Sequence, residues 1–234
     1  MTKQAVLNHR EADEVVSTGI QLPEGFAAGL VEYLKNGKSG LDSTLEKLGE
    51  LGLEANRFQG NEADKSRLIA DIEAVDQEIL EELALYATDL LNPLRKALGS
   101  VAVEVSSLAL DYAKSLATSI EAGLYKHDYD SLIEIAKQKG VEPQGKDCIA
   151  FSEYKEDGYS LYDAKELIYQ GLVWRLFDDS HADYGHAAIL LGIGQVDSGV
   201  EAIGFAFSRL SLHVEWLLTH MIFIPKDWVL AQAD

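Results

Sequence analysis

The residues from 178 to 186 form the densest group of side chains that could do chemistry. On a helix, Asp179, Asp183 and His186 would be spaced i, i+4 and i+7, so two carboxylates and an imidazole could face one divalent cation. The same residue types also suit a structural role, because an aspartate or serine within 178–180 could cap a helix beginning near residue 181. We expect a helix cap here, and a metal or phosphate site at the three residues is the alternative.

The other candidate chemical groups are weaker. His213 and His220 are seven residues apart, about 10 Å along a helix, which is too far for one metal ion without further ligands. We expect core histidines hydrogen-bonded to neighbours, with Arg209 and Glu215 each paired across helices. The sequence has no G-x-S-x-G, P-loop or H-E-x-x-H motif, and no histidine is near Cys148 in the sequence. We therefore expect no catalytic residues and no cofactor.

The distribution of acidic residues along the chain is a more distinctive feature than any of these motifs. Between Arg67 and Arg95 there are seven acidic residues and no basic one, and four of them project along one line of the helix predicted there. A second stretch without a base, between Arg175 and Arg209, holds another cluster. Such acids can simply keep a protein soluble, or they can attract a basic partner. On the second interpretation, the partner-binding residues are Asp71, Glu78, Glu82, Asp89, Asp178, Asp179 and Asp183.

The overall composition limits the classes of function. The 234 residues carry a formal charge of −19, which argues against direct binding to nucleic acid or to an anionic membrane. The apolar content of 47% is ordinary for a folded globular protein. One cysteine excludes an internal disulfide, and no apolar stretch of signal-peptide length follows Met1. These features predict a soluble cytoplasmic protein.

Apolar spacing, prolines and glycines predict helices through most of the chain. Pro23 and Gly37 bound the first helix, and Ser160 with Asp163 resembles a capping box that opens another. Pro93 should kink or end the longest of the remaining helices. The predicted helices cover residues 23–36, 41–55, 61–98, 101–122, 128–139, 160–178 and 181–193, with 61–98 and 101–122 packed as an antiparallel pair.

Residues 199–224 determine the predicted architecture. Their apolar residues repeat in steps of three and four, and the other faces are also apolar, which is typical of a buried helix. Arg209 and Glu215 in the middle argue against a membrane span. We predict an all-α fold, a helical bundle or irregular α-array of about seven to nine helices around a buried central helix at 199–224. One domain over 1–234 is expected, with a possible boundary in the irregular residues 141–158, between N-terminal helices in 1–140 and C-terminal helices in 159–234.

Three hypotheses for function follow. The leading one is a non-enzymatic protein that binds and inhibits a basic protein, most simply an immunity-type protein that neutralises a toxin or nuclease by direct contact. The first alternative is a helical-bundle enzyme or ligand binder with a metal or phosphate site at Asp179, Asp183 and His186. The second is a structural protein that assembles, as a homo-oligomer, through coiled-coil-like helices.

Overall fold

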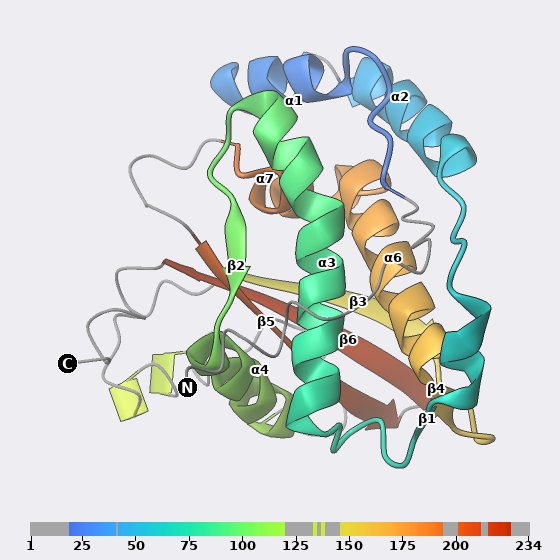
Figure 1. The fold of residues 1–234 in the computed structure, drawn as a ribbon. Helices are drawn as coiled ribbons and strands as arrows, with labels where there is room; N and C mark the ends of the chain where they lie inside the picture. The colour runs from blue at the N-terminus through green and yellow to red at the C-terminus, as the bar shows by residue number, and fades with distance from the viewer. Residues whose placement is uncertain are drawn as a thin grey trace, which may run out of the picture.

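A four-stranded mixed sheet lies between helices on both of its faces (Figure 1). The computed structural model describes residues 19–40, 42–119, 133–134, 137–138, 146–193, 201–211 and 215–225. Strands β2 and β5 are parallel, and the other neighbouring strands are antiparallel. The order across the sheet is β2 (Val103–Val105), β5 (Glu201–Ser211), β6 (Glu215–Pro225) and β3 (Lys146–Glu153). A separate two-stranded sheet pairs β1 (Leu68–Ile69) with β4 (Tyr159–Ser160).

Helices α3 and α6 pack on one face of the large sheet and α4 packs on the other. Within the part of the chain that the structure describes, no helix is both long enough and apolar enough to cross a membrane. The helices are α1 (Phe26–Lys35), α2 (Asp42–Ala55), α3 (Gln77–Leu98), α4 (Ser107–Ser119), α6 (Leu161–Phe177) and α7 (Gly185–Leu191), and two short 3₁₀ helices are η2 (Glu62–Ser66) and η3 (Ser180–Ala182).

The all-α prediction is wrong, most clearly at residues 199–224. Instead of a central helix, β5 and β6 form an antiparallel pair that runs from Glu201 opposite Pro225 to Ser211 opposite Glu215. Helical layers cover both faces of these strands, so both faces are apolar and the alternation typical of a half-exposed strand is missing. Most residues of this stretch are apolar, so apolar residues could be found at steps of three and four although the described residues form strands.

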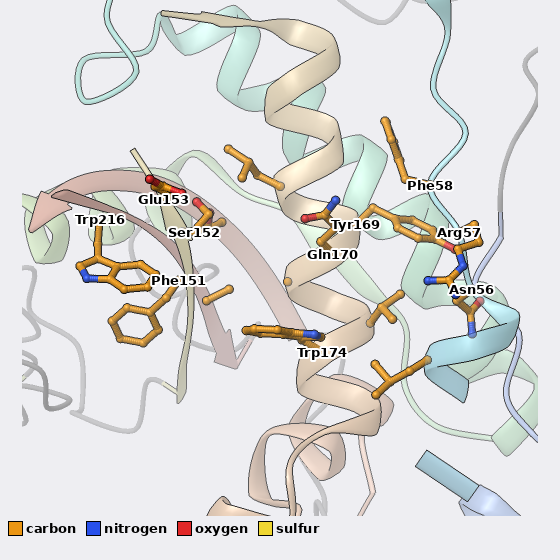
Figure 2. A pocket seen from close by; sticks show the side chains of 16 residues that line it. Asn56, Arg57, Phe58, Phe151, Ser152, Glu153, Tyr169, Gln170, Trp174 and Trp216 are labelled. Atoms are coloured by element: carbon orange, nitrogen blue, oxygen red, sulfur yellow. The ribbon is translucent and has the colours of Figure 1, made fainter. Parts of the chain in front are cut away.

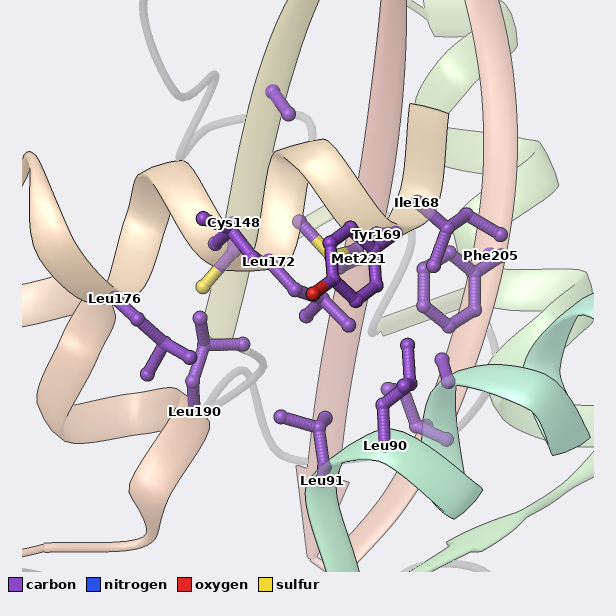
Figure 3. Close-up of a cluster of buried hydrophobic side chains, with 14 of the residues drawn as sticks. Leu90, Leu91, Cys148, Ile168, Tyr169, Leu172, Leu176, Leu190, Phe205 and Met221 are labelled. Atoms are coloured by element: carbon purple, nitrogen blue, oxygen red, sulfur yellow. The ribbon is translucent and has the colours of Figure 1, made fainter. Parts of the chain in front are cut away.

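The two faces of β5 can be told apart by their neighbours. Phe205 packs with Met221 and with Leu90 of α3 in the main core (Figure 3). Ala206, on the opposite face, belongs to the cluster that α4 covers. On the same face as Ala206, a Cβ atom on Gly204 would lie 2.0 Å from the carbonyl oxygen of Ala109 in α4, so a side chain there would force the helix away. The sheet is therefore the middle layer that positions the helices.

Several helices also begin or end at residues other than those predicted from the sequence. The helix expected from residue 61 begins at Gln77, because η2 and β1 occupy the residues before it. It continues through Pro93 and ends at Gly99, whose φ of 71° is readily adopted by glycine. The helix expected at 101–122 is replaced by β2 and α4, and α3 and α4 lie on opposite faces of the sheet instead of forming a pair. Most of 128–139 lies outside the described residues, and 141–158 contains β3.

The predicted capping box at α6 is confirmed. The Ser160 hydroxyl accepts a hydrogen bond from the Asp163 backbone N–H, and the Asp163 carboxylate accepts one from the Ser160 N–H at 2.8 Å. Lys155 also donates to Asp163, at 2.5 Å. Burial raises the pKa of Asp163, but the hydrogen bonds from Lys155 and Ser160 outweigh it and lower the pKa to about 2. The cap thus depends on an ionised Asp163.

Replacing Ser160 by alanine should lower the free energy of unfolding by about 0.5–2 kcal/mol near pH 7, the usual loss for an N-cap. Because the folded pKa of Asp163 is below the unfolded value of about 3.9, its contribution is present above that pH and is lost as the pH falls from about 4 to about 2. In urea unfolding, the difference in free energy of unfolding between wild type and Ser160→Ala should therefore become smaller as the pH falls from about 4 to about 2. Exposed Ser180→Ala is the control, and a gap that does not change with pH contradicts the account.

A buried ion pair joins three elements at one end of the sheet. Arg95 of α3 and Glu201 of β5 are 2.9 Å apart, with side chains 1% and 3% exposed. The same guanidinium donates to the carbonyl oxygens of Leu190 and Ile189 in α7 and of Val101 before β2, at 2.8, 2.6 and 3.0 Å. Burial lowers the pKa of Arg95, and the Glu201 carboxylate opposes that shift. This network fixes the position of α7 and β5 relative to α3.

Candidate functional site

A groove of about 560 Å³ lies beside the edge strand β3 (Figure 2). Strand β3 forms one side, α6 crosses beside it, and the end of α2 with the residues that follow it closes the far side. Aromatic side chains from all of these segments and from β6 reach the lining. The lining residues are Leu53, Asn56, Arg57, Phe58, Ala150, Phe151, Ser152, Glu153, Leu167, Tyr169, Gln170, Gly171, Val173, Trp174, Trp216 and Thr219.

The position of α6 against β3 follows from two of its residues. Gly171 faces β3 so closely that an added Cβ would lie 2.8 Å from the Cβ of Ala150, which is closer than real side chains approach. One turn further on, the Nε of Arg175 donates to the carbonyl oxygen of Ile149 at 2.7 Å. A small residue and a hydrogen bond therefore hold the helix beside the strand, and Trp174 projects from this fixed segment into the groove.

The α2 side of the groove is held by Asn56. Its side-chain oxygen accepts from the Gln21 N–H at 2.8 Å, and its Nδ2 donates to the carbonyl oxygens of Gln21 and Gly52 at 2.9 and 2.7 Å. The ring of Phe58 then packs against Tyr169 of α6, with ring centroids 5.7 Å apart. Burial raises the pKa of the Tyr169 hydroxyl. The far side is therefore preorganised, with the apolar ring of Phe58 facing α6.

Trp174 is the most unusual residue of the groove. Its side chain is 58% exposed, although the residues before and after it in α6, Val173 and Arg175, are buried and half-buried. Phe151 and Trp216 are half-buried and lie on the other side of the β3 edge (Figure 2). Exposed aromatic surface in a hollow marks a contact site more often than it marks a solvated surface.

The charged groups of the lining are Arg57 and Glu153, which are exposed and lie on opposite sides of the groove in Figure 2. Two further acids adjoin lining residues in the sequence: Glu54 follows Leu53 and is exposed, and Glu166 precedes Leu167 and is half-buried. The groove is thus apolar in its middle, with acids in excess around it.

A second hollow, of about 580 Å³, lies beside β1 and β4. Two of its charged groups are already bound within the chain: Lys65 contacts Glu62 at 2.8 Å, and Asp163 accepts from Lys155 and from Ser160. The third, Asp157, is exposed. It lacks an exposed tryptophan. The groove beside β3 is therefore the better candidate site.

Of the predicted metal ligands, the structure brings together Asp179 and His186. Asp179 is fully buried, and its carboxylate lies 2.6 Å from the Nδ1 of His186. It also accepts from the backbone N–H groups of His186 and Ala187, at 2.8 and 3.1 Å. These N–H groups belong to the first turn of α7, so Asp179 caps that helix from six residues before it begins. An aspartate therefore caps a helix here, as expected, but this helix begins at Gly185 and the predicted start near residue 181 is wrong.

Asp183 does not join this pair. It lies in a tight reversal with Tyr184, where both residues have left-handed φ values of 51° and 56°, and its side chain is 62% exposed and 3.4 Å from Lys38. Within the residues that the structure describes, no group of three or more His, Cys, Asp or Glu side chains could hold a metal ion. The spacing i, i+4, i+7 required a continuous helix, but η3 and this reversal interrupt it.

Replacing Asp179 by alanine should lower the free energy of unfolding by about 1–3 kcal/mol, because one buried and one partly buried N–H group at the start of α7 lose their acceptor. Asp178→Ala is a matched control, since Asp178 is the adjacent residue and is exposed; it should change the free energy by less than about 0.5 kcal/mol. Urea unfolding measures both. A larger loss from Asp178→Ala than from Asp179→Ala contradicts the capping role.

The predicted line of acids on one helix is also altered. Glu82 is held by Arg67 at 2.9 and 2.7 Å and by Lys165 at 3.1 Å, and Lys165 also binds buried Asp64 at 2.7 Å. Burial raises the pKa of Glu82, but the hydrogen bonds from Arg67 and Lys165 outweigh it and hold the pKa below its usual value. Glu82 therefore ties α3 to α6.

The other acids of this line remain on the surface. Glu78 and Asp89 are exposed on α3. Asp71 is exposed too, but it precedes the helix, and its carboxylate accepts from the Glu73 N–H at 2.9 Å. The line is thus shorter than predicted, and whether these acids meet a partner stays a prediction.

The expected core histidine is confirmed for His220, whose Nε2 lies 2.8 Å from the Ser208 hydroxyl in a fully buried position. His213 lies outside the described residues. Arg209 and Glu215 do pair, at 2.8 Å, but across the β5–β6 hairpin and not across helices.

Local sequence patterns do not predict the groove, because its lining comes from four segments between residues 53 and 219. One signal was present: Trp174 lies off the stripe of Ile168, Leu172 and Leu176 that α6 buries, so a large aromatic residue was due to face outward.

Comparison with known proteins supports this architecture. No family model matches the sequence, and no curated protein matches it. A solved structure, the CAP domain of enterococcal PrgA, is similar, with 27% sequence identity and a TM-score of 0.71 over 90% of this chain and 87% of that one. The likeness extends over most of both chains, and it supports the mixed α/β fold in place of the all-α bundle predicted from the sequence.

Proposed function

We propose that this chain is a non-catalytic protein-recognition domain that binds a segment of a basic protein in the groove beside β3. The observation that carries the proposal is Trp174, which is 58% exposed within a groove lined by aromatic residues from α6, β3, β6 and the segment after α2. A few residues supply most of the binding energy in protein interfaces, and tryptophan and tyrosine are enriched among them.

The charge of the chain favours a basic partner. A net charge of −19 attracts a cationic protein over a long range, and the acids near the groove would favour Lys or Arg side chains beside it. Neutralisation of a basic toxin, with the cytoplasmic location predicted from the sequence, is one form that this function could take. The groove is the part of the proposal that the geometry supports.

The groove suits a protein segment better than a reaction. Its charged groups, Arg57 and Glu153, are exposed, whereas catalytic sites commonly place converging polar groups in a water-excluded pocket. Its middle is formed by apolar and aromatic side chains on rigid elements, which limits the entropy lost on binding.

The test is selection from a phage-displayed library of random dodecapeptides on the immobilised wild-type protein, after which the binding of the enriched peptides to wild type and to two variants is compared. The proposal expects enriched peptides that carry Lys or Arg and that lose binding to Trp174→Ala but keep binding to Leu85→Ala, a variant of an exposed leucine on α3. Enrichment of peptides that bind the Trp174→Ala protein equally well would overturn the groove as the binding site.

A further inference from the structure

We infer that the bound segment is an extended strand that adds to the sheet at the outer edge of β3, opposite Phe151–Glu153. This inference rests on the proposed function, and it specifies how the partner binds: through backbone hydrogen bonds to β3, with alternate side chains entering the groove. The argument uses the register of β3, the cover along its edge and the charges beside it.

The register shows which backbone groups of β3 point outward. Strand β3 pairs with β6 on one side only, and it is the last strand in the described sheet. The Tyr154 N–H donates to the carbonyl oxygen of Glu215 at 2.9 Å, so residue 154 faces β6. Along an antiparallel strand, the backbone N–H and C=O groups of successive residues point alternately toward the partner strand and away from it. The backbone groups of Ser152 therefore also point to β6, and those of Phe151 and Glu153 point to the open edge.

Part of this edge is already covered. The carbonyl oxygen of Ile149, the next outward residue, accepts hydrogen bonds from the Arg175 guanidinium. In the described part of the chain, no hydrogen bond from outside β3 reaches the backbone groups of Phe151 or Glu153. An open window therefore remains from Phe151 to Glu153, and it coincides with the stretch of β3 that lines the groove. A strand edge with open donors and acceptors is a template for another strand.

The side chains around this window favour an extended segment. Trp174 stands on the α6 side of β3, and Phe151 and Trp216 stand on the other side (Figure 2). Successive side chains of a strand point to opposite faces, so an added strand would direct one set toward Trp174 and the other toward Phe151 and Trp216. Both sets would meet aromatic surface.

Charge complementarity identifies the chemistry of the segment. Glu153 lies at the end of the window, and Glu54 and Glu166 adjoin the lining. The cations nearby are Arg57, which is exposed, and Arg175, whose guanidinium is bound to the carbonyl oxygen of Ile149. A like-charged, acidic segment would be repelled. We therefore assign the site to an extended peptide with apolar residues in its middle and Lys or Arg at its flanks.

The experiment is amide hydrogen exchange, followed by NMR on the ¹⁵N-labelled full chain, with and without a dodecapeptide selected as above. Strand addition predicts that the Phe151 and Glu153 amides exchange at least about 10-fold more slowly in the complex, because they become hydrogen-bonded, while Ser152 changes little since it already faces β6. If the peptide slows exchange at all three residues by a similar factor, or at none of them, strand addition is overturned.

A pair of variants at one position gives a second measurement. Glu153→Pro removes the outward N–H, which an edge strand tolerates, together with the carboxylate; Glu153→Ala removes the carboxylate alone. Glu153→Pro should bind the peptide at least about 10-fold more weakly than Glu153→Ala, a ratio that corresponds to one lost backbone hydrogen bond. Equal affinities overturn the inference. Circular dichroism establishes that both variants are folded.

The outcomes separate this inference from the proposed function. A peptide that binds in a Trp174-dependent way without slowing exchange at Phe151 and Glu153 preserves the recognition groove and refutes strand addition. Loss of Trp174 dependence refutes the groove itself. Slower exchange that depends on protein concentration and not on peptide assigns the edge to a second copy of the chain, and that refutes the assignment to a basic segment.

Discussion

Replacing Arg95 by methionine is expected to lower the free energy of unfolding by about 3–5 kcal/mol, the largest effect of any substitution considered for this protein. The change leaves the Glu201 carboxylate, 3% exposed, without the cation that lies 2.9 Å from it. The carbonyl oxygens of Ile189, Leu190 and Val101 would also lose a donor. Urea unfolding measures the loss through the midpoint and the slope.

Two comparisons make this prediction specific. Lys96→Met changes the adjacent residue, which is exposed, and should shift the free energy by less than about 0.5 kcal/mol. The double variant Arg95→Met with Glu201→Met should recover part of the loss, because no unpaired charge is then buried. A loss below about 1 kcal/mol for Arg95→Met alone would show that the pair is not a centre of stability.

Replacing Trp174 by alanine is expected to weaken binding of a selected basic peptide by about 30-fold or more, the range for a tryptophan at the centre of an interface. The fold should be little affected, because the indole is 58% exposed in the unbound protein. Isothermal titration calorimetry gives the dissociation constant, and thermal unfolding gives the stability.

Leu85→Ala is the matched control for this effect. Leu85 is also a large exposed apolar residue, 48% exposed, but it lies on α3 and is absent from the groove lining. It should leave the dissociation constant within about 2-fold of wild type, as distant surface substitutions generally do. Equal losses from the two variants would indicate nonspecific hydrophobic binding.

The elements predicted correctly are those marked by a pattern of residues close together in the sequence. Ser160 and Asp163 form a reciprocal cap three residues apart, and this pattern is visible without any tertiary information. Helix α2 matches the expected 41–55 closely for a similar reason, since its leucine spacing is local. Tertiary contacts were not needed to find either one.

The strands were missed because their signal depends on what covers them. Alternation appears when one face of a strand meets water, but β5 and β6 are covered on both faces, with Phe205 in the main core and Ala206 under α4. A run of apolar residues then fits a buried helix as well as a buried strand. Residues 141–158 read as an irregular domain boundary because Pro143, Gly145 and Gly158 lie among them, although they contain strand β3.

The predicted metal site failed because the helix that it required is interrupted. Asp179, Asp183 and His186 could converge only on an unbroken helix, and the reversal at Asp183 and Tyr184 turns one of them away. The groove could not be predicted, because Phe58, Phe151, Trp174 and Trp216 are brought together by the sheet and by the packing of α6 on β3. No local sequence pattern contains that information.

The most direct test of the recognition groove is a titration of the ¹⁵N-labelled protein with a selected basic peptide, observed at the indole N–H signals of Trp174 and Trp216. The account predicts that both signals shift with the same saturation curve as the amides of residues 150–153, since all of these residues line the groove. Saturable binding that leaves both indoles and these amides unchanged, while the amides of Asp71, Glu78 and Asp89 shift, would contradict it.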